Sequence, residues 1–161
     1  MDEQIVVKEA SIEDSSQIHN LWKKLSYDHF KKDEYLDKEI NIDHVTQAMY
    51  EDIIKNPTCK IFAAFDEDKI VGYIETWIKQ PGDDFYIDKY AYILHCYIDK
   101  ESRGLKIANK LYYAMENFVK KQGIKYIHAD VYEHNKKFKN ALRYHGLETY
   151  RTRLIKQIDQ D

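Results

Sequence analysis

The feature that most constrains the fold is a change of hydrophobic period near residue 100. Apolar residues up to Ile98 follow a strand pattern, and a polar turn containing Arg103 and Gly104 comes next. Helical spacing then begins, at Ile107, Leu111, Met115 and Phe118. A helix N-terminus has unpaired N–H groups and a partial positive charge, so this turn predicts a site for a phosphate-rich cofactor. The alternative is an ordinary turn with a solvated Arg103.

The rest of the chain predicts further alternation of strands and helices without repeats or linkers. The expected strands are residues 5–9, 60–65, 69–78, 91–98, 126–131 and 150–158. The first expected helix follows a capping-box-like Ser11–Asp14, and the second has Val45, Met49 and Ile53 on one face. Two more are expected at 106–122 and 138–144. The fold class is therefore α/β.

The strand before the turn has a break in its alternation. Ile93, Cys96 and Ile98 are candidates for one buried face, but they are spaced by three and then two residues. A one-residue bulge near Leu94 and His95 would restore the alternation, and bulges leave backbone groups unpaired. A freed N–H there is a candidate to stabilise a carbonyl oxygen that gains charge, a contact worth roughly 3 kcal/mol in a transition state. The alternative is a regular, fully buried strand.

Composition narrows the classes of function. With 161 residues, the chain is expected to be a single domain over 1–161. Its 25 basic and 28 acidic residues, a net charge of -3, favour neither nucleic acid nor an anionic membrane as a partner. The distant Cys59 and Cys96 indicate neither a metal site nor a disulfide scaffold. Without a signal-peptide pattern or a long apolar run, a cytoplasmic location is expected.

The segment Arg103–Ala108 resembles the Arg/Gln-x-x-Gly-x-Gly/Ala motif of the GNAT superfamily of acyl-CoA-dependent N-acyltransferases. Lys106 stands where that family usually has its middle glycine, and we expect it in the right-handed helical conformation that tolerates a Cβ. A second match is Asn135, a helix and Gly146, which keep the family interval of eleven residues. Leu142 departs from it, at the position where many members carry a tyrosine.

The resemblance implies a mixed, mostly antiparallel sheet, splayed at an acetyl-CoA cleft and flanked by helices. It implies cofactor-binding residues at Cys96, Tyr97, Ile98, Arg103, Gly104, Leu105, Lys106, Ile107, Ala108 and Asn135. The first three would contact pantetheine through their backbones, the next six would bind the pyrophosphate, and Asn135 would line the cleft. A basic set near the last helix is a candidate for the 3'-phosphate or a solvated helix face: Lys136, Lys137, Lys139 and Arg143.

The chemistry implied is attack by a neutral amine on a thioester, which requires a proton acceptor. His95 is the first candidate because histidine titrates near neutral pH, and Glu75 on the neighbouring strand is the alternative. Tyr144 is the phenol nearest to Leu142, but two residues along a helix rotate a side chain by about 200°. Each of these three also has a purely structural interpretation, and His128 and His134 are weaker candidates.

The resulting hypothesis is an N-acetyltransferase that moves an acetyl group from acetyl-CoA to a primary amine, with no metal. The alternative is a catalytically inactive CoA-binding sensor or interaction module, motivated by Lys106 and Leu142. The sequence does not identify the acceptor, which is a small-molecule or protein amine. Residues 150–158, as an exposed final strand, would allow a homodimer by edge pairing.

Overall fold

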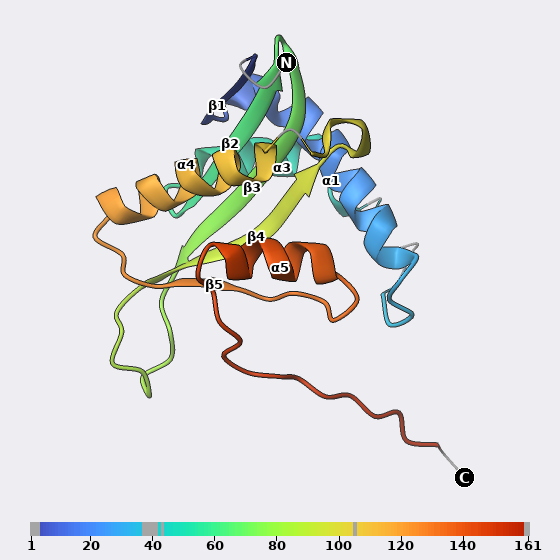
Figure 1. The fold of residues 1–161 in the computed structure, drawn as a ribbon, viewed down its shortest axis with the longest axis vertical. Coiled ribbons are helices and arrows are strands. Elements are labelled where there is room, and N and C mark those ends of the chain that lie inside the picture. The colour runs from blue at the N-terminus through green and yellow to red at the C-terminus, as the bar shows by residue number, and fades with distance from the viewer. Residues whose placement is uncertain (1–3, 37–41, 43, 105, 160–161) are drawn as a thin grey trace. The chain divides into compact units, whose positions relative to one another are not determined.

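A computed structural model describes residues 4–36, 42, 44–104 and 106–159 (Figure 1). The chain divides into two compact units, Met1–Asp130 and Val131–Asp161. The first unit contains β1 (Ile5–Glu9), α1 (Ser15–Phe30), α3 (Gln47–Lys55), β2 (Cys59–Asp66), β3 (Lys69–Lys79), β4 (Tyr90–Ile98), α4 (Ile107–Lys121) and β5 (Ile127–Ala129). The second contains α5 (Lys136–Tyr144). None of the helices in the described ranges is long and apolar enough to cross a bilayer.

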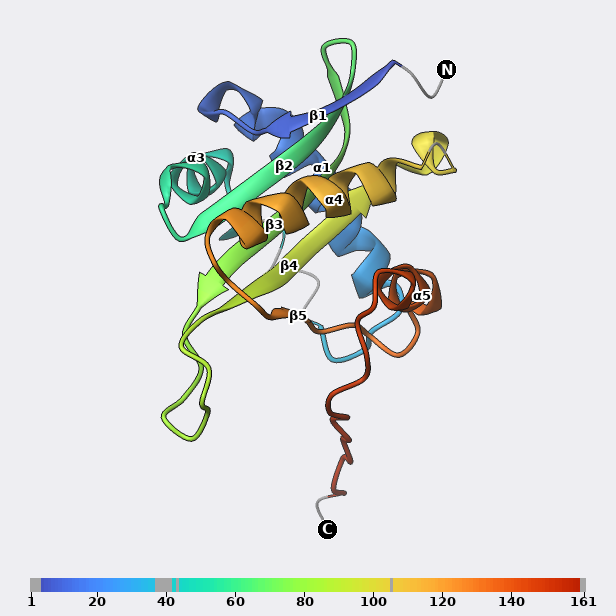
Figure 2. The ribbon, with the colours of Figure 1, turned by 60° about the vertical axis from the view of Figure 1, so that its left-hand side comes forward.

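The first unit is built on a five-stranded sheet in the order β1-β2-β3-β4-β5 (Figure 2). The first four strands pair antiparallel, and β5 pairs parallel to β4. The expected hairpin of residues 60–65 and 69–78 is confirmed as β2 and β3. The predicted α/β class, with a mixed and mostly antiparallel sheet, is therefore correct.

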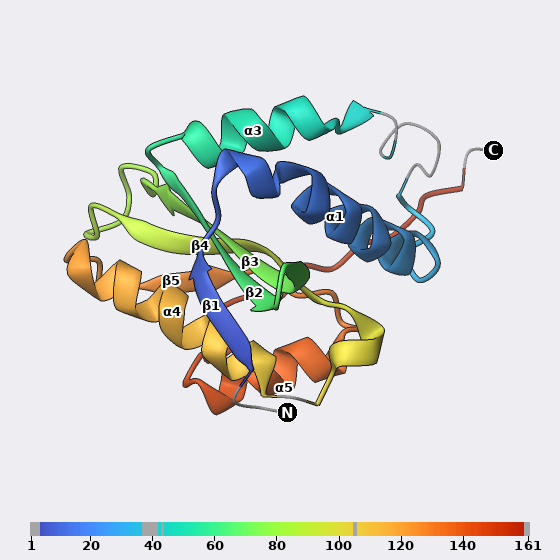
Figure 3. The same ribbon diagram turned by 90° about the horizontal axis from the view of Figure 1, so that it is seen from above.

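Helices cover both faces of this sheet (Figure 3). On one face α1 and α3 enclose a core that includes Ile18, Trp22, Tyr50 and Tyr73. On the other face α4 packs through buried residues at helical spacing: Ile107, Leu111, Tyr112, Met115 and Val119. The face expected for α3 is partly wrong, because Met49 is exposed and Tyr50 is its buried residue. The aromatic ring of Tyr50 packs against Trp22, with ring centres 6.5 Å apart, so this side of α3 faces the core.

Local sequence explains where the early helices begin. The Ser11 amide donates to the Asp14 carboxylate at 2.7 Å, and this capping box starts the turn Ile12–Asp14 that leads into α1. The Thr46 hydroxyl accepts from the Met49 amide at 3.3 Å and caps α3. Both helices are thus fixed at the end where the chain enters them.

The second unit has one helix and an extended tail. Asn135 caps α5, with its side-chain oxygen accepting from the Phe138 amide at 3.3 Å. Gly146 ends the helix with a φ of 88°, which favours glycine. The final strand expected at residues 150–158 is wrong, because this segment has no regular structure and its side chains are exposed. A strand needs a partner for its backbone groups, and no described strand pairs with these residues.

Candidate active site

A β-bulge in β4 organises the candidate site. Thr76 of β3 pairs with Ile93, but the adjacent Glu75 pairs with His95, so Leu94 is the extra residue in β4. The predicted bulge near Leu94 and His95 is therefore confirmed.

The bulge also coincides with the end of the parallel pairing. Strand β5 matches β4 only from Ala91 to Ile93, and β4 continues to Ile98 without a partner in the described β5 ladder. After the bulge, Cys96 and Ile98 lie opposite Ile74 and Gly72, on the same face as Ile93 opposite Thr76. The backbone of residues 94–98 is therefore freed from the parallel neighbour on that side, where the pantetheine contacts are expected.

The opposite face of the same strands brings two sequence candidates together. The His95 Nδ1 lies 2.8 Å from Glu75 Oε2, so the two residues form one hydrogen-bonded pair rather than separate alternatives. The side chain of Glu75 is 1% exposed and that of His95 is 28% exposed. A proton acceptor that contacts a substrate must be reachable, so His95 is the outward member of the pair.

The sequence interpretation missed the other partner of this carboxylate. The indole Nε1–H of Trp77 donates to Glu75 Oε1 at 2.7 Å. The signal was the spacing, because Tyr73, Glu75 and Trp77 at i, i+2 and i+4 lie on one face of β3. Each carboxylate oxygen of Glu75 thus has one nitrogen partner, as a buried carboxylate requires.

Phenols and a thiol surround this carboxylate. Burial, and after it the negative charge of Glu75, raises the pKa of Tyr50 above its ordinary value. Burial also raises the pKa of Tyr73, with Tyr50 and Glu75 adding to the effect. Burial, and after it the negative charge of Glu75, also raises the pKa of the Cys59 thiol. These groups remain protonated, and Glu75 is the buried carboxyl group at the centre of the cluster.

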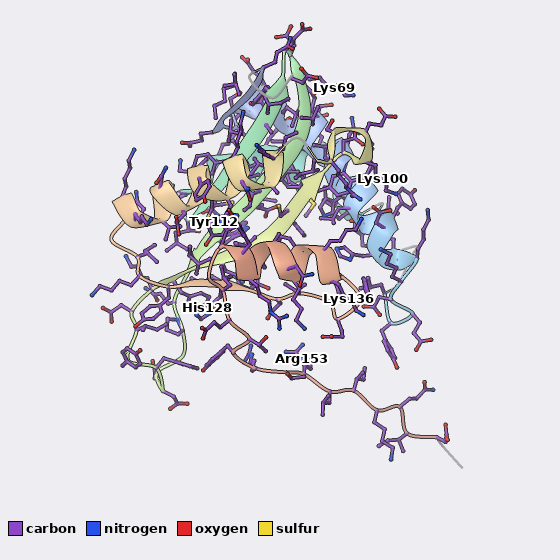
Figure 4. All side chains as sticks on the ribbon, viewed as in Figure 1. Lys69, Lys100, Tyr112, His128, Lys136 and Arg153 are labelled. Atoms are coloured by element: carbon purple, nitrogen blue, oxygen red, sulfur yellow. The ribbon has the colours of Figure 1, made fainter. Side chains whose placement is uncertain are left out.

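The turn after β4 is tied to α1 by charge. Lys24 Nζ lies 2.7 Å from Asp99 Oδ2, and Lys100 Nζ lies 2.9 Å from Asp28 Oδ1. The hydrogen bond from Lys24 is the main cause that lowers the pKa of Asp99. Figure 4 shows Lys100 in this turn beyond the end of β4. These two ion pairs connect the turn, just before α4, to α1.

Arg103 folds back on the strand end. Its Nε–H donates to the Ile98 carbonyl at 3.1 Å, and its guanidinium lies 5.5 Å from the centre of the Tyr97 ring. Gly104 follows with a φ of 100°, which favours glycine. The Arg103 side chain remains 46% exposed, so it keeps a solvent-facing cation beside the start of α4.

The backbone conformation of Lys106 differs from the one expected from the sequence. This residue has a φ of 57° and a ψ of 16°, which is left-handed rather than the right-handed conformation expected, and it is the N-cap residue of α4. This conformation explains why a glycine suits the position in the motif. Lysine has no side-chain acceptor, so it does not cap the amides of the first turn at Ile107 and Ala108. Those amides have no acceptor within the helix, and the exposed cations beside them fit an anionic diphosphate.

The remaining residues predicted from the sequence to belong to the site differ in their burial and contacts. Ile107 is buried, whereas Leu105 lies outside the described residues. In the second unit, Asn135 caps α5, and Tyr144 is the last helical residue with a side chain 73% exposed. Among the basic set, Lys139 pairs with Glu133 at 3.0 Å.

The two weaker histidine candidates pack against tyrosines. His128 stacks on Tyr90 with ring centres 4.2 Å apart, and His134 stacks on Tyr132 at 5.2 Å. In the described ranges, no three His, Cys, Asp or Glu side chains gather as a metal site.

Comparison with known proteins identifies the family. The sequence model of the acetyltransferase (GNAT) family matches residues 17–146, which is most of the chain. The chain belongs to the GNAT acetyltransferase family. The expected resemblance is thereby confirmed, and the fold with its bulged β4 is the GNAT fold. No curated protein matches the sequence.

Solved structures share the fold at low sequence identity. A mutant of the BH1408 protein from Bacillus halodurans is 18% identical, with a TM-score of 0.85 over 95% of this chain and 99% of that one. A predicted acetyltransferase with acetyl-CoA from Clostridium acetobutylicum is 17% identical, with a TM-score of 0.74 over 95% and 96%. AAC(6')-Iy in complex with the bisubstrate analogue CoA-S-monomethyl-acetylneamine is 13% identical, with a TM-score of 0.75 over 97% and 99%.

Proposed function

We propose that this GNAT protein transfers an acetyl group from acetyl-CoA to a primary amine. The observation that carries the proposal is the bulge at Leu94, which places the paired His95 and Glu75 where β4 leaves its parallel partner. The backbone of Cys96, Tyr97 and Ile98 would hold pantetheine. The turn and the first amides of α4 would hold the pyrophosphate. The family model spans the boundary at residue 130, which supports both units acting as one domain.

The proposed reaction assigns each proton. The acceptor arrives as an ammonium group and gives one proton to His95 Nε2. The amine nitrogen then bonds to the acetyl carbonyl carbon while the carbon–sulfur bond breaks. Tyr144 is proposed to donate its proton to the departing CoA thiolate and to take up the second proton of that nitrogen in exchange. The sum is one amide, one thiol and one proton that leaves through His95.

The acceptor is proposed only as a class. AAC(6')-Iy was solved with an analogue that joins CoA to an acetylated neamine, which supports an amine acceptor for this relative. The present chain is 13% identical to AAC(6')-Iy and shares its fold. We therefore propose a small-molecule or protein primary amine and no metal.

The test is acetyl transfer from radiolabelled acetyl-CoA to a panel of primary amines, including aminoglycosides, polyamines and peptide N-termini. We expect incorporation with at least one acceptor, and a loss of about 10²- to 10⁴-fold in kcat/KM for His95→Ala. Tyr144→Phe tests the second proton in the same assay. Binding of acetyl-CoA without turnover on any amine would favour the alternative, an inactive CoA-binding sensor.

A further inference from the structure

We infer that the buried Glu75 carboxylate fixes the tautomer of His95, with the ring proton on Nδ1, and that Trp77 holds the other carboxylate oxygen as its acceptor. The inference rests on the proposed function, in which His95 Nε2 accepts the proton. It makes Glu75 and Trp77 positioning residues, because the Glu75 side chain is buried and His95 is the member of the pair that a substrate could reach.

The chemistry of the three groups leaves one arrangement. An indole Nε1–H only donates, and an ionised carboxylate only accepts. Trp77 therefore uses Oε1 of Glu75 as its acceptor at 2.7 Å. Oε2, at 2.8 Å from His95 Nδ1, also accepts, so the proton of the neutral imidazole is on Nδ1. The lone pair is then on Nε2, which has no hydrogen-bond partner in the described part of the chain.

The other groups around Glu75 do not impose a direction. They come from three elements, with Cys59 on β2, Tyr73 on β3 and Tyr50 on α3. Hydroxyl and thiol groups both donate and accept, so they adapt to either orientation of the acid. His19 packs against Tyr50, with ring centres 6.0 Å apart. The indole of Trp77 is thus the group in this cluster that can only donate, so it requires an acceptor oxygen from the side chain at position 75.

The need of Trp77 for an acceptor predicts a specific effect of an amide at position 75. In Glu75→Gln only one side-chain oxygen remains, and Trp77 needs it as an acceptor. The amide NH₂ then faces His95 Nδ1, which must become the acceptor. The imidazole proton moves to Nε2, and the lone pair needed for catalysis is lost.

Removing the indole should reverse the effect. In Glu75→Gln combined with Trp77→Phe, no donor holds the amide oxygen, so the amide turns over and accepts from Nδ1–H. Phenylalanine keeps an aromatic ring at this position, and Trp77→Phe alone serves as the matched control. The double variant should therefore resemble the wild type more than Glu75→Gln does.

The experiment is ¹⁵N NMR of the neutral histidine ring in the full chain, read together with kcat/KM on the panel. We expect Nδ1–H in the wild type and in Trp77→Phe, Nε2–H in Glu75→Gln, and Nδ1–H again in the double variant. We expect kcat/KM to fall about 10²- to 10⁴-fold in Glu75→Gln and to recover at least about tenfold in the double variant.

Three results would overturn the inference: an Nε2–H wild type, an unchanged tautomer in Glu75→Gln, or a double variant that stays Nε2–H. The wild-type spectrum alone is decisive if Glu75→Gln does not fold. If the tautomers behave as expected but no amine is acetylated, the positioning of His95 by Glu75 and Trp77 stands and the proposed reaction fails.

Discussion

Gly72 lies against the backbone of Tyr97, where a Cβ on Gly72 would stand 3.0 Å from the Tyr97 carbonyl oxygen and 3.1 Å from Ile98 Cγ1. Strand β3 therefore approaches the end of β4 closely at the residues proposed to hold pantetheine. The absence of a side chain at Gly72 sets the position of that backbone.

Gly72→Ala should push the end of β4 away and lower the free energy of unfolding by about 1–3 kcal/mol. Gly82→Ala is the matched control, since a Cβ there meets nothing within 4 Å and should change stability by less than about 0.5 kcal/mol. Urea unfolding of both variants measures the difference. Equal stability of the two variants would contradict the close approach.

Lys106→Gly should relieve the left-handed conformation at the N-cap of α4 and stabilise the fold by up to about 1 kcal/mol. Ala108→Gly, two residues further on and inside α4, should instead lose about 0.5–1 kcal/mol. Denaturant midpoints compare the two glycines directly. A loss at position 106 as large as that at 108 would show that the strain is absent.

Lys24→Met should remove the partner that lowers the pKa of Asp99. Because that pKa is lowered in the folded state, the stabilisation is present above the unfolded value of about 3.9 and disappears as pH falls through the folded value. Lys24 is half exposed, so we expect less than about 1 kcal/mol at neutral pH. Unfolding curves at neutral and acid pH should converge for wild type and variant. A difference that persists in strong acid would contradict the ion pair as its cause.

The Cys96 thiol should react slowly with alkylating reagents, because burial raises its pKa to about 12. At about pH 8 only about one thiol in 10⁴ is then ionised, and the thiolate is the reactive form. Mass spectrometry of the labelled native chain, with the urea-unfolded chain as control, measures the rate at this site. Labelling as fast as in the unfolded chain would contradict the shift.

Part of the site followed directly from the sequence. The spacing of Ile93, Cys96 and Ile98 predicted the bulge, because strict alternation along a strand can be restored only by one extra residue. The strand, turn and helix around Arg103 were predicted by the change of period. Both are local properties of a short segment.

The pairing of Glu75 with His95 could not be predicted in the same way. It depends on the register between β3 and β4, and a slip of one residue would put Glu75 on the other face. The conformation of Lys106 was also mispredicted, because a lysine carries no signal for positive φ. The strand expected at 150–158 failed because its apolar residues do not specify a partner.

The most direct measurement of the central claim is thermal unfolding with acetyl-CoA, using ATP and NAD as phosphate-bearing controls. Acetyl-CoA at about 100 times its Kd should stabilise the protein by roughly 2.7 kcal/mol and raise Tm by several degrees, with no comparable shift from the controls. An unchanged Tm with acetyl-CoA and with longer acyl-CoAs would contradict acyl transfer from CoA by this GNAT protein.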